Sequence, residues 1–145
     1  MPAAADSSTV LAFDFGTRRI GVAVGDTGTR LAHPLATIER EREADRFAAI
    51  AALVDEWKPS RLVVGLPVHA DGTPHGTTGR ARRFGRQLAG RTGLPVDYAD
   101  ERHTTQDAAS ALAEAGVTGR AARAVRDRVA AQRILQAWLD ERARA

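Results

Sequence analysis

The stretch TVLAFDFGTRRIGVAVGD, residues 9–26, decides the fold of this chain. Its first seven residues form an apolar run of strand length, which a single acid, Asp14, interrupts. Gly16–Arg19 then supplies a turn, and large and small apolar residues alternate over Ile20–Val24, as is typical of a packed strand. Two strands joined this closely predict the start of an antiparallel meander.

Downstream of this hairpin the pattern changes to alternating strands and helices. A third strand is expected over 31–38, where Pro34 indicates a sheet edge or a bulge, and two short apolar strands over 61–66 and 96–100. Four helices are expected: two carry the apolar stripes Phe47-Ile50-Val54-Trp57 and Ala81-Phe84-Leu88, and two run over about 104–115 and 121–142. This order predicts an α/β fold, a mixed sheet of five strands with flanking helices.

Length and composition exclude several classes of protein. The 145 residues are the length of one domain, which we place at 9–145 after a flexible tail at 1–8. Without cysteine there is no disulfide, thiolate metal site or cysteine nucleophile. No apolar run approaches the ~20 residues of a membrane span. The first residues lack the basic start and apolar stretch of a signal peptide, so a cytoplasmic protein with no membrane partner is expected.

Basic residues are concentrated in two segments. Residues 76–92 carry five arginines and no acid, and residues 118–145 carry seven arginines and three acids. Lys58 is the one lysine in the chain, and the planar guanidinium of arginine suits phosphate. These segments favour a polyanion such as nucleic acid as the partner, with a solvated helix face as the alternative.

Acids at three places are candidates for chemistry. Asp14 lies inside a hydrophobic strand, where an unpaired carboxylate is costly. Asp100 and Glu101 end the last strand, where a sheet delivers side chains into a crevice. Asp127 lies on the apolar face of the last helix, because apolar residues follow it at i+3, i+4, i+7 and i+8.

Three carboxylates from two strands and a helix can bind divalent cations. Oxygen donors without cysteine or paired histidines favour Mg²⁺ or Mn²⁺ over Zn²⁺. Two such ions ~3.5–4 Å apart can hold and hydrolyse a phosphodiester. The structural alternatives are a turn cap for Asp14, a surface charge cluster for 100–102, and an ion pair of Asp127 with Arg102 or Arg19.

Four motifs in the chain resemble, in order, those of the YqgF-type (RuvX-like) family. They are DFGTRRIGVAVGD at 14–26, VVGLP at 63–67 with Asp71-Gly72, DERHTT at 100–105, and DRVAA at 127–131 with ILQAWL at 134–139. Together they cover residues 9–140. The family is similar to ribonuclease H-like nucleases, and its members are described as pre-16S rRNA nucleases and as Holliday junction resolvases.

The resemblance implies a ribonuclease H-like fold with three antiparallel strands followed by parallel ones. It also implies metal-dependent phosphodiester hydrolysis by Asp14, Glu101 and Asp127, with Asp14 bridging the metal ions. Two departures from the family pattern are Gly25, where a serine is usual, and arginines in place of lysines before the last motif. The arginines expected to contact nucleic acid are Arg18, Arg19, Arg82, Arg83, Arg86, Arg102 and Arg126.

The sequence therefore predicts a nuclease that uses Mg²⁺ or Mn²⁺ to process the 5′ end of pre-16S rRNA during ribosome biogenesis, as a monomer or weak homodimer. The alternatives are a Holliday junction resolvase that acts on branched DNA and a nucleic-acid-binding module without turnover. A third class, an ATPase of the actin and sugar-kinase type, is disfavoured because that fold closes two domains around ATP and this chain has the length of one.

Overall fold

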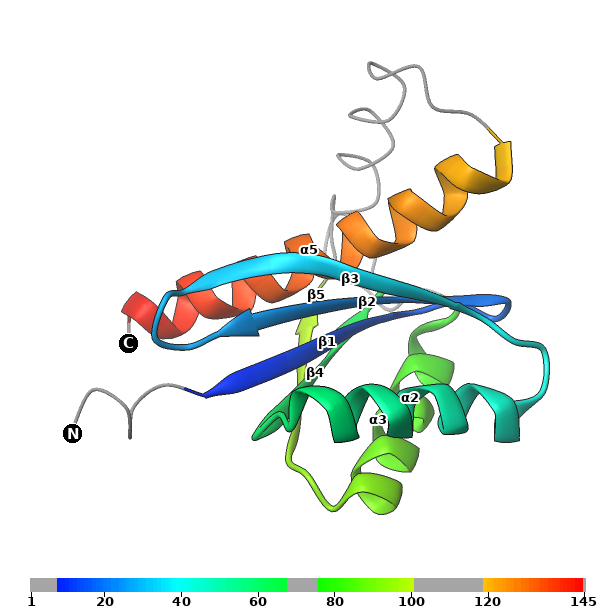
Figure 1. The fold of residues 1–145 in the computed structure, drawn as a ribbon, viewed down its shortest axis with the longest axis horizontal. Coiled ribbons are helices and arrows are strands. Elements are labelled where there is room, and N and C mark those ends of the chain that lie inside the picture. The colour runs from blue at the N-terminus through cyan, green and yellow to red at the C-terminus, as the bar shows by residue number, and fades with distance from the viewer. Residues whose placement is uncertain (1–7, 68–75, 101–118, 145) are drawn as a thin grey trace.

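The computed structural model describes residues 8–67, 76–100 and 119–144, and within them one mixed sheet carries helices on both faces (Figure 1). The elements are β1 Thr9–Phe15, β2 Arg19–Asp26, β3 Leu31–Glu39, α2 Glu43–Trp57, β4 Arg61–Leu66, α3 Thr78–Thr92, β5 Val96–Asp100 and α5 Gly119–Arg144. The strand order is β3-β2-β1-β4-β5. The β1–β2 and β2–β3 pairs are antiparallel, and the β1–β4 and β4–β5 pairs are parallel. The predicted five-stranded mixed sheet is confirmed.

The opening hairpin pairs without a break from Thr9 opposite Asp26 to Phe15 opposite Ile20. Strand β3 lies at the edge of the sheet, and its register against β2 shifts where Pro34 pairs with Ala23. Pro34 therefore lies on an edge strand and also at a register shift, the two positions that the sequence offered as alternatives. Both positions suit proline, because it has no backbone N–H to donate to a neighbouring strand.

The two faces of the sheet bury different side chains, because successive residues of a strand point to opposite sides. Leu11 and Phe13 of β1 pack with the residues of α2 and α3, and Val10 and Ala12 pack with those of α5. Figure 1 shows the same division, with α5 on one face and α2 and α3 on the other. Asp14 has the same parity as Val10 and Ala12, and so it faces α5.

The helices match the prediction in place and differ from it in detail. Helix α2 stops at Lys58, which is left-handed with φ of 47°, and α3 stops at Gly93 with φ of 72°. Trp57, the last residue of the apolar stripe of α2, is 37% exposed and borders a hollow with residues of β1, β2 and β3. The apolar spacing of a helix indicates its inner face and not how completely each position on it is covered. The helix expected over 104–115 lies outside the described residues.

The N-terminal boundary is visible at Ser8. Its backbone N–H donates to Oγ1 of Thr27 at 3.0 Å, and its carbonyl accepts from the Thr27 N–H at 2.9 Å. Residue 8, assigned to the tail from sequence, is thus held by the turn after β2. Among the described helices, none combines the length and the apolar character that crossing a membrane requires.

Candidate active site

Asp14 and Asp127 are brought to one place by a glycine. Asp14 is the penultimate residue of β1 and pairs with Gly21 of β2. A Cβ atom on Gly21 would overlap the backbone carbonyl of Asp127, so α5 crosses β2 with its backbone directly against this residue. Ala130 and Ala131, buried one turn further along α5, continue the close approach. Gly21 is therefore required here by the close packing of α5 on β2.

Asp127 is held by Arg19, the first residue of β2. Nε of Arg19 donates to Oδ2 of Asp127 at 2.6 Å. The two side chains are 24% and 16% exposed, so water screens this ion pair less than a surface pair. The sequence left open whether Arg19 or Arg102 pairs with Asp127. The partner is Arg19, and Arg102 lies outside the described residues.

The two acids line a hollow of about 240 Å³ at the carboxyl end of β1. The residues around it are Asp14, Phe15, Gly16, Thr17, Arg18, Arg19 and Asp127. Within the described part of the chain no three histidine, aspartate or glutamate side chains gather as a metal site. Two carboxylates, hard oxygen donors in a partly buried hollow, suit Mg²⁺ or Mn²⁺ and need a third ligand. Glu101, the predicted third acid, is not among the described residues.

The parallel strands deliver their carboxyl ends to the same edge of the sheet. Leu66 of β4 pairs with Asp100, the last residue of β5, at the edge where β1 ends beside Asp14. Ala99 packs into the α5 cluster, whereas Tyr98 packs into the cluster of α2 and α3. Asp100 lines a different hollow, with Tyr98, Ala99 and four residues of α5, and is not among the residues around the hollow of Asp14.

Polar contacts that the hydrophobic pattern did not reveal hold α5 across the sheet. Gln132 donates to the Ala32 carbonyl, and Gln136 accepts from the Ala32 N–H, both at 3.0 Å. The hydrogen bond from Arg120 lowers the pKa of Glu39 and joins the first turn of α5 to the end of β3. The only sequence signal for these contacts is the i, i+4 spacing of the two glutamines.

Gly25, the departure from the family pattern, lies away from the acids. It pairs with Val10 near the other end of the hairpin. A Cβ atom there would lie 2.9 Å from Cδ2 of Leu135 and 2.9 Å from the Leu31 carbonyl oxygen. Position 25 in this chain is therefore a packing position beneath α5 and does not line the hollow of Asp14.

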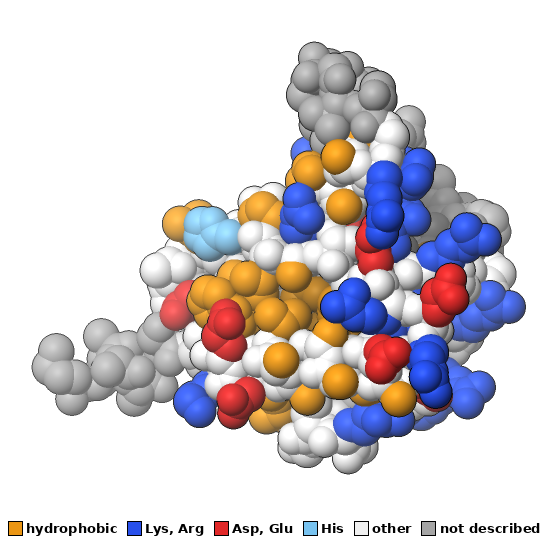
Figure 2. All heavy atoms as spheres, turned by 45° about the vertical axis from the view of Figure 1, so that its right-hand side comes forward, with side chains coloured by type: hydrophobic (Ala, Val, Ile, Leu, Met, Phe, Trp, Pro, Cys, Tyr) orange, Lys and Arg blue, Asp and Glu red, His pale blue; other side chains and the backbone are white. Residues whose placement is uncertain are grey.

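The predicted nucleic-acid arginines fall into two groups. Arg18 and Arg19 line the hollow, and Arg126 precedes Asp127 on α5. The second group is the exposed set Arg82, Arg83 and Arg86 on α3, on the other face of the sheet. Figure 2 shows one view of the molecule, with basic side chains gathered on its right and a patch of hydrophobic side chains left of its centre.

The strand order, the acid at the end of the first strand and the acid on the helix that crosses the sheet define a ribonuclease H-like domain. Solved structures with this fold include the Thermus thermophilus RuvC bound to a Holliday junction substrate. Its TM-score is 0.53 at 17% identity, and the match covers 93% of this chain and 96% of that one. A second structure of Thermus thermophilus RuvC gives a TM-score of 0.51 at 16% identity.

The chain belongs to the RuvX family, whose description is Holliday junction resolvase and whose family model matches residues 8–141. A relative from Dechloromonas aromatica is 58% identical over 132 residues, which cover 91% of this chain and 90% of that protein. A relative from Nitrosomonas europaea is 56% identical over 136 residues, which cover 94% and 92%. Both relatives carry the name "Putative pre-16S rRNA nuclease".

The Arg19–Asp127 pair predicts a measurable coupling between the two side chains. We expect Arg19→Gln and Asp127→Asn each to lower the free energy of unfolding by about 1–2 kcal/mol, because each leaves a partly buried group without its charged partner. The double variant should lose less than the sum of the two. Urea unfolding of the wild type and the three variants checks this.

The exposed Arg120–Glu39 pair is the matched control, since it has the same 2.6 Å separation but an arginine that is 78% exposed. Its double-mutant cycle should give little or no coupling. Equal coupling energies in the two cycles would contradict the view that partial burial makes the Arg19–Asp127 pair the stronger one.

Proposed function

We propose that this protein is a metal-dependent nuclease that acts in the cytoplasm, as a monomer or weak homodimer, on the 5′ end of pre-16S rRNA. The observation that carries the proposal is the meeting of Asp14 and Asp127 in an arginine-lined hollow at the carboxyl end of β1. The names of the relatives support the substrate. The exposed arginines of α3 support binding of a polyanion.

Asp14, Asp127 and Glu101 are the residues we propose to hold Mg²⁺ or Mn²⁺. Such ions, when bound, neutralise the phosphodiester and lower the pKa of a water molecule. Strand β1 fixes Asp14 from within the sheet. Arg19 takes Oδ2 of Asp127, which leaves Oδ1 for the cation.

Glu101 is preferred to Asp100 as the third ligand because it matches the acid of the family motif, and because Asp100 lines a different hollow from that of Asp14. Arg18, exposed beside the hollow, is placed to contact a phosphate.

The metal requirement gives a direct test. Cleavage of a precursor rRNA 5′ leader should proceed in Mg²⁺ or Mn²⁺ and stop in excess chelator. Ca²⁺ should support binding without cleavage, because it takes 6–8 ligands at longer distances and positions a phosphate poorly. Undiminished cleavage in chelator would remove the metal from the mechanism.

Resolution of branched DNA is the second candidate, favoured by the description of the family and by the likeness of the fold to RuvC. A synthetic four-way junction assayed beside the rRNA leader separates the two. Cleavage of the leader alone supports rRNA processing. Paired, symmetric cuts in the junction by a dimer, with the leader left intact, would favour resolution instead.

The α3 arginines predict a change in the salt dependence of binding. Arg82, Arg83 and Arg86 are exposed. If each contacts one phosphate, their replacement by alanine should reduce the slope of log affinity against log salt by about 2 for a single strand, ~0.7 for each contact. The measurement is affinity against salt concentration, in Ca²⁺ to prevent cleavage.

Arg133→Ala, an exposed arginine on α5, is the control and should leave the slope nearly unchanged. The weakening in the triple variant should be similar for different sequences, because phosphate contacts carry no base information. An unchanged slope in the triple variant would mean that these three arginines do not contact phosphate and only face solvent.

A further inference from the structure

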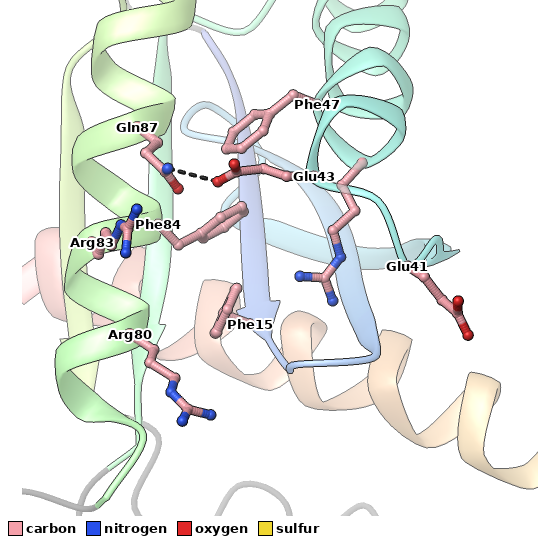
Figure 3. A pocket seen from close by; sticks show the side chains of 9 residues that line it. Phe15, Glu41, Glu43, Phe47, Arg80, Arg83, Phe84 and Gln87 are labelled. Atoms are coloured by element: carbon pink, nitrogen blue, oxygen red, sulfur yellow. Dashed lines mark hydrogen bonds between the residues drawn. The ribbon is translucent and has the colours of Figure 1, made fainter.

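A second hollow lies on the other face of the sheet, between α2 and α3 (Figure 3). Its volume is about 280 Å³. Pockets for drug-sized ligands measure ~300–1,000 Å³, so this hollow has room for one small group such as a single planar ring system. The residues that line it are Phe15, Glu41, Glu43, Arg46, Phe47, Arg80, Arg83, Phe84 and Gln87.

Three phenylalanines form the floor of this pocket. The ring of Phe84 lies 5.0 Å from that of Phe15 and 5.8 Å from that of Phe47, measured between centroids. Phe47 and Phe84 are buried, whereas Phe15 is only partly buried. Phe15 therefore supplies the aromatic surface that a ligand in the pocket can reach.

Positive charge surrounds this aromatic surface. Figure 3 shows Arg80 and Arg83 on α3 at the side of the hollow. Arg46 of α2 donates to the carbonyls of Arg40 and Gly16, at 3.0 and 2.7 Å, and its guanidinium lies 5.6 Å from the Phe15 ring centroid. Burial lowers the pKa of Arg46. Arg80 and Arg83 are exposed, so an anion can reach them, whereas the charge of Arg46 interacts with that of Glu43.

The pocket and the proposed active site share one lining residue. Phe15 lines both hollows, and it follows Asp14 on β1 with its side chain on the opposite face. The Gly16 carbonyl, which Arg46 holds, belongs to the turn that borders the hollow of Asp14. A strand whose phosphate lies at Asp14 can therefore pass over this turn and reach the pocket with a neighbouring nucleotide.

We propose that this pocket binds one unpaired nucleotide of a single strand, with the base against Phe15 and a phosphate on Arg80 and Arg83. The proposal rests on the nuclease function proposed above and adds a subsite to it. Glu41 and Glu43 also line the pocket, and Glu43 accepts a hydrogen bond at 2.7 Å from Gln87 of α3, across the pocket (Figure 3). The two carboxylates repel phosphate, so we expect the backbone of the strand to lie beside Arg80 and Arg83 and away from Glu43.

The test is an abasic scan. A short single-stranded oligonucleotide, in an RNA and a DNA version, is made with the base removed at one position at a time. Its affinity is measured in Ca²⁺ by fluorescence anisotropy. The wild type should lose about 5- to 100-fold in affinity at one position, since a base stacked on an aromatic side chain contributes ~1–3 kcal/mol. If the affinity falls in only one of the two versions, RNA or DNA, that polymer is the one whose nucleotide the pocket binds.

Two variants of Phe15 assign the effect to its ring. Phe15→Tyr keeps the aromatic surface and should keep the sensitive position. Phe15→Leu keeps a large apolar side chain and should lose that position. No sensitive position in the wild type, or equal sensitivity in Phe15→Leu, overturns the proposal. Thermal melting of each variant establishes that it is folded.

The arginines have a control of equal charge outside the pocket. Arg80→Ala with Arg83→Ala should weaken binding more than Arg42→Ala with Arg133→Ala, which removes the same charge at two exposed residues that do not line the pocket. Equal weakening overturns the phosphate contact. Cleavage of the same oligonucleotide in Mn²⁺ is scored separately. Cleavage without a sensitive position refutes the pocket alone, and a sensitive position without cleavage refutes the nuclease function alone.

Discussion

Asp14→Asn should lower the rate of cleavage by about three orders of magnitude or more, because a neutral amide removes the charge that holds the cation, a contribution of several kcal/mol. Asparagine has nearly the same shape as aspartate, so the strand pairing of Asp14 with Gly21 should persist. Initial rates in Mg²⁺ and in Mn²⁺, with circular dichroism to establish folding, measure the effect.

Asp100→Asn is the matched control for this prediction. Asp100 lies at the same edge of the sheet and is exposed, but it lines a different hollow from that of Asp14. Its substitution should change the rate little. A rate for Asp14→Asn close to that of the wild type, or an equal loss in both variants, would contradict the assignment of Asp14 as the central ligand.

Gly21→Ala should be the most damaging single-methyl change in the described part of the molecule. The added Cβ would overlap the backbone carbonyl of Asp127, which a change of rotamer cannot relieve. We expect a loss of about 3 kcal/mol or more in the free energy of unfolding, at the upper end of overpacking effects. Cleavage should fall as well, because α5 must move Asp127 away from Asp14.

Urea unfolding measures the loss, and Gly90→Ala serves as the control. Gly90 lies on the exposed side of α3, where a Cβ would contact nothing within 4 Å. Alanine there should stabilise the protein by about 0.5–1 kcal/mol, since glycine is the poorer helix former. Unchanged stability in Gly21→Ala would contradict the close approach of α5 to β2.

The parts of the fold that depend on local pattern were predictable from the sequence. The 9–26 hairpin, the edge position of Pro34 and the inward face of Asp127 each follow from periodicity or backbone chemistry within one element. The choice of Arg19 over Arg102 as the partner of Asp127 was not predictable, because it depends on how α5 crosses the sheet. Periodicity also could not indicate that Trp57 is 37% exposed, since apolar spacing does not say how completely a position is covered.

The acids of the candidate site were predictable from the sequence, whereas the second pocket was not. Asp14 and Asp127 were identified as unusual from their apolar surroundings, and the structure brings both into one hollow. The second pocket was not predictable, because Phe15 and Phe84 read as ordinary core residues. Only their packing leaves Phe15 partly open beside Arg80 and Arg83.

The span of 108 residues between Arg19 and Asp127 has a consequence for the time at which activity appears. A chain folds from its N-terminus as it is synthesised, at about 5–20 residues per second. Strands β1, β2 and β3 can pair while α5 is still untranslated, and Asp14 then stands without Asp127. For the function proposed above, we therefore expect a nascent chain to lack cleavage activity until its last helix docks.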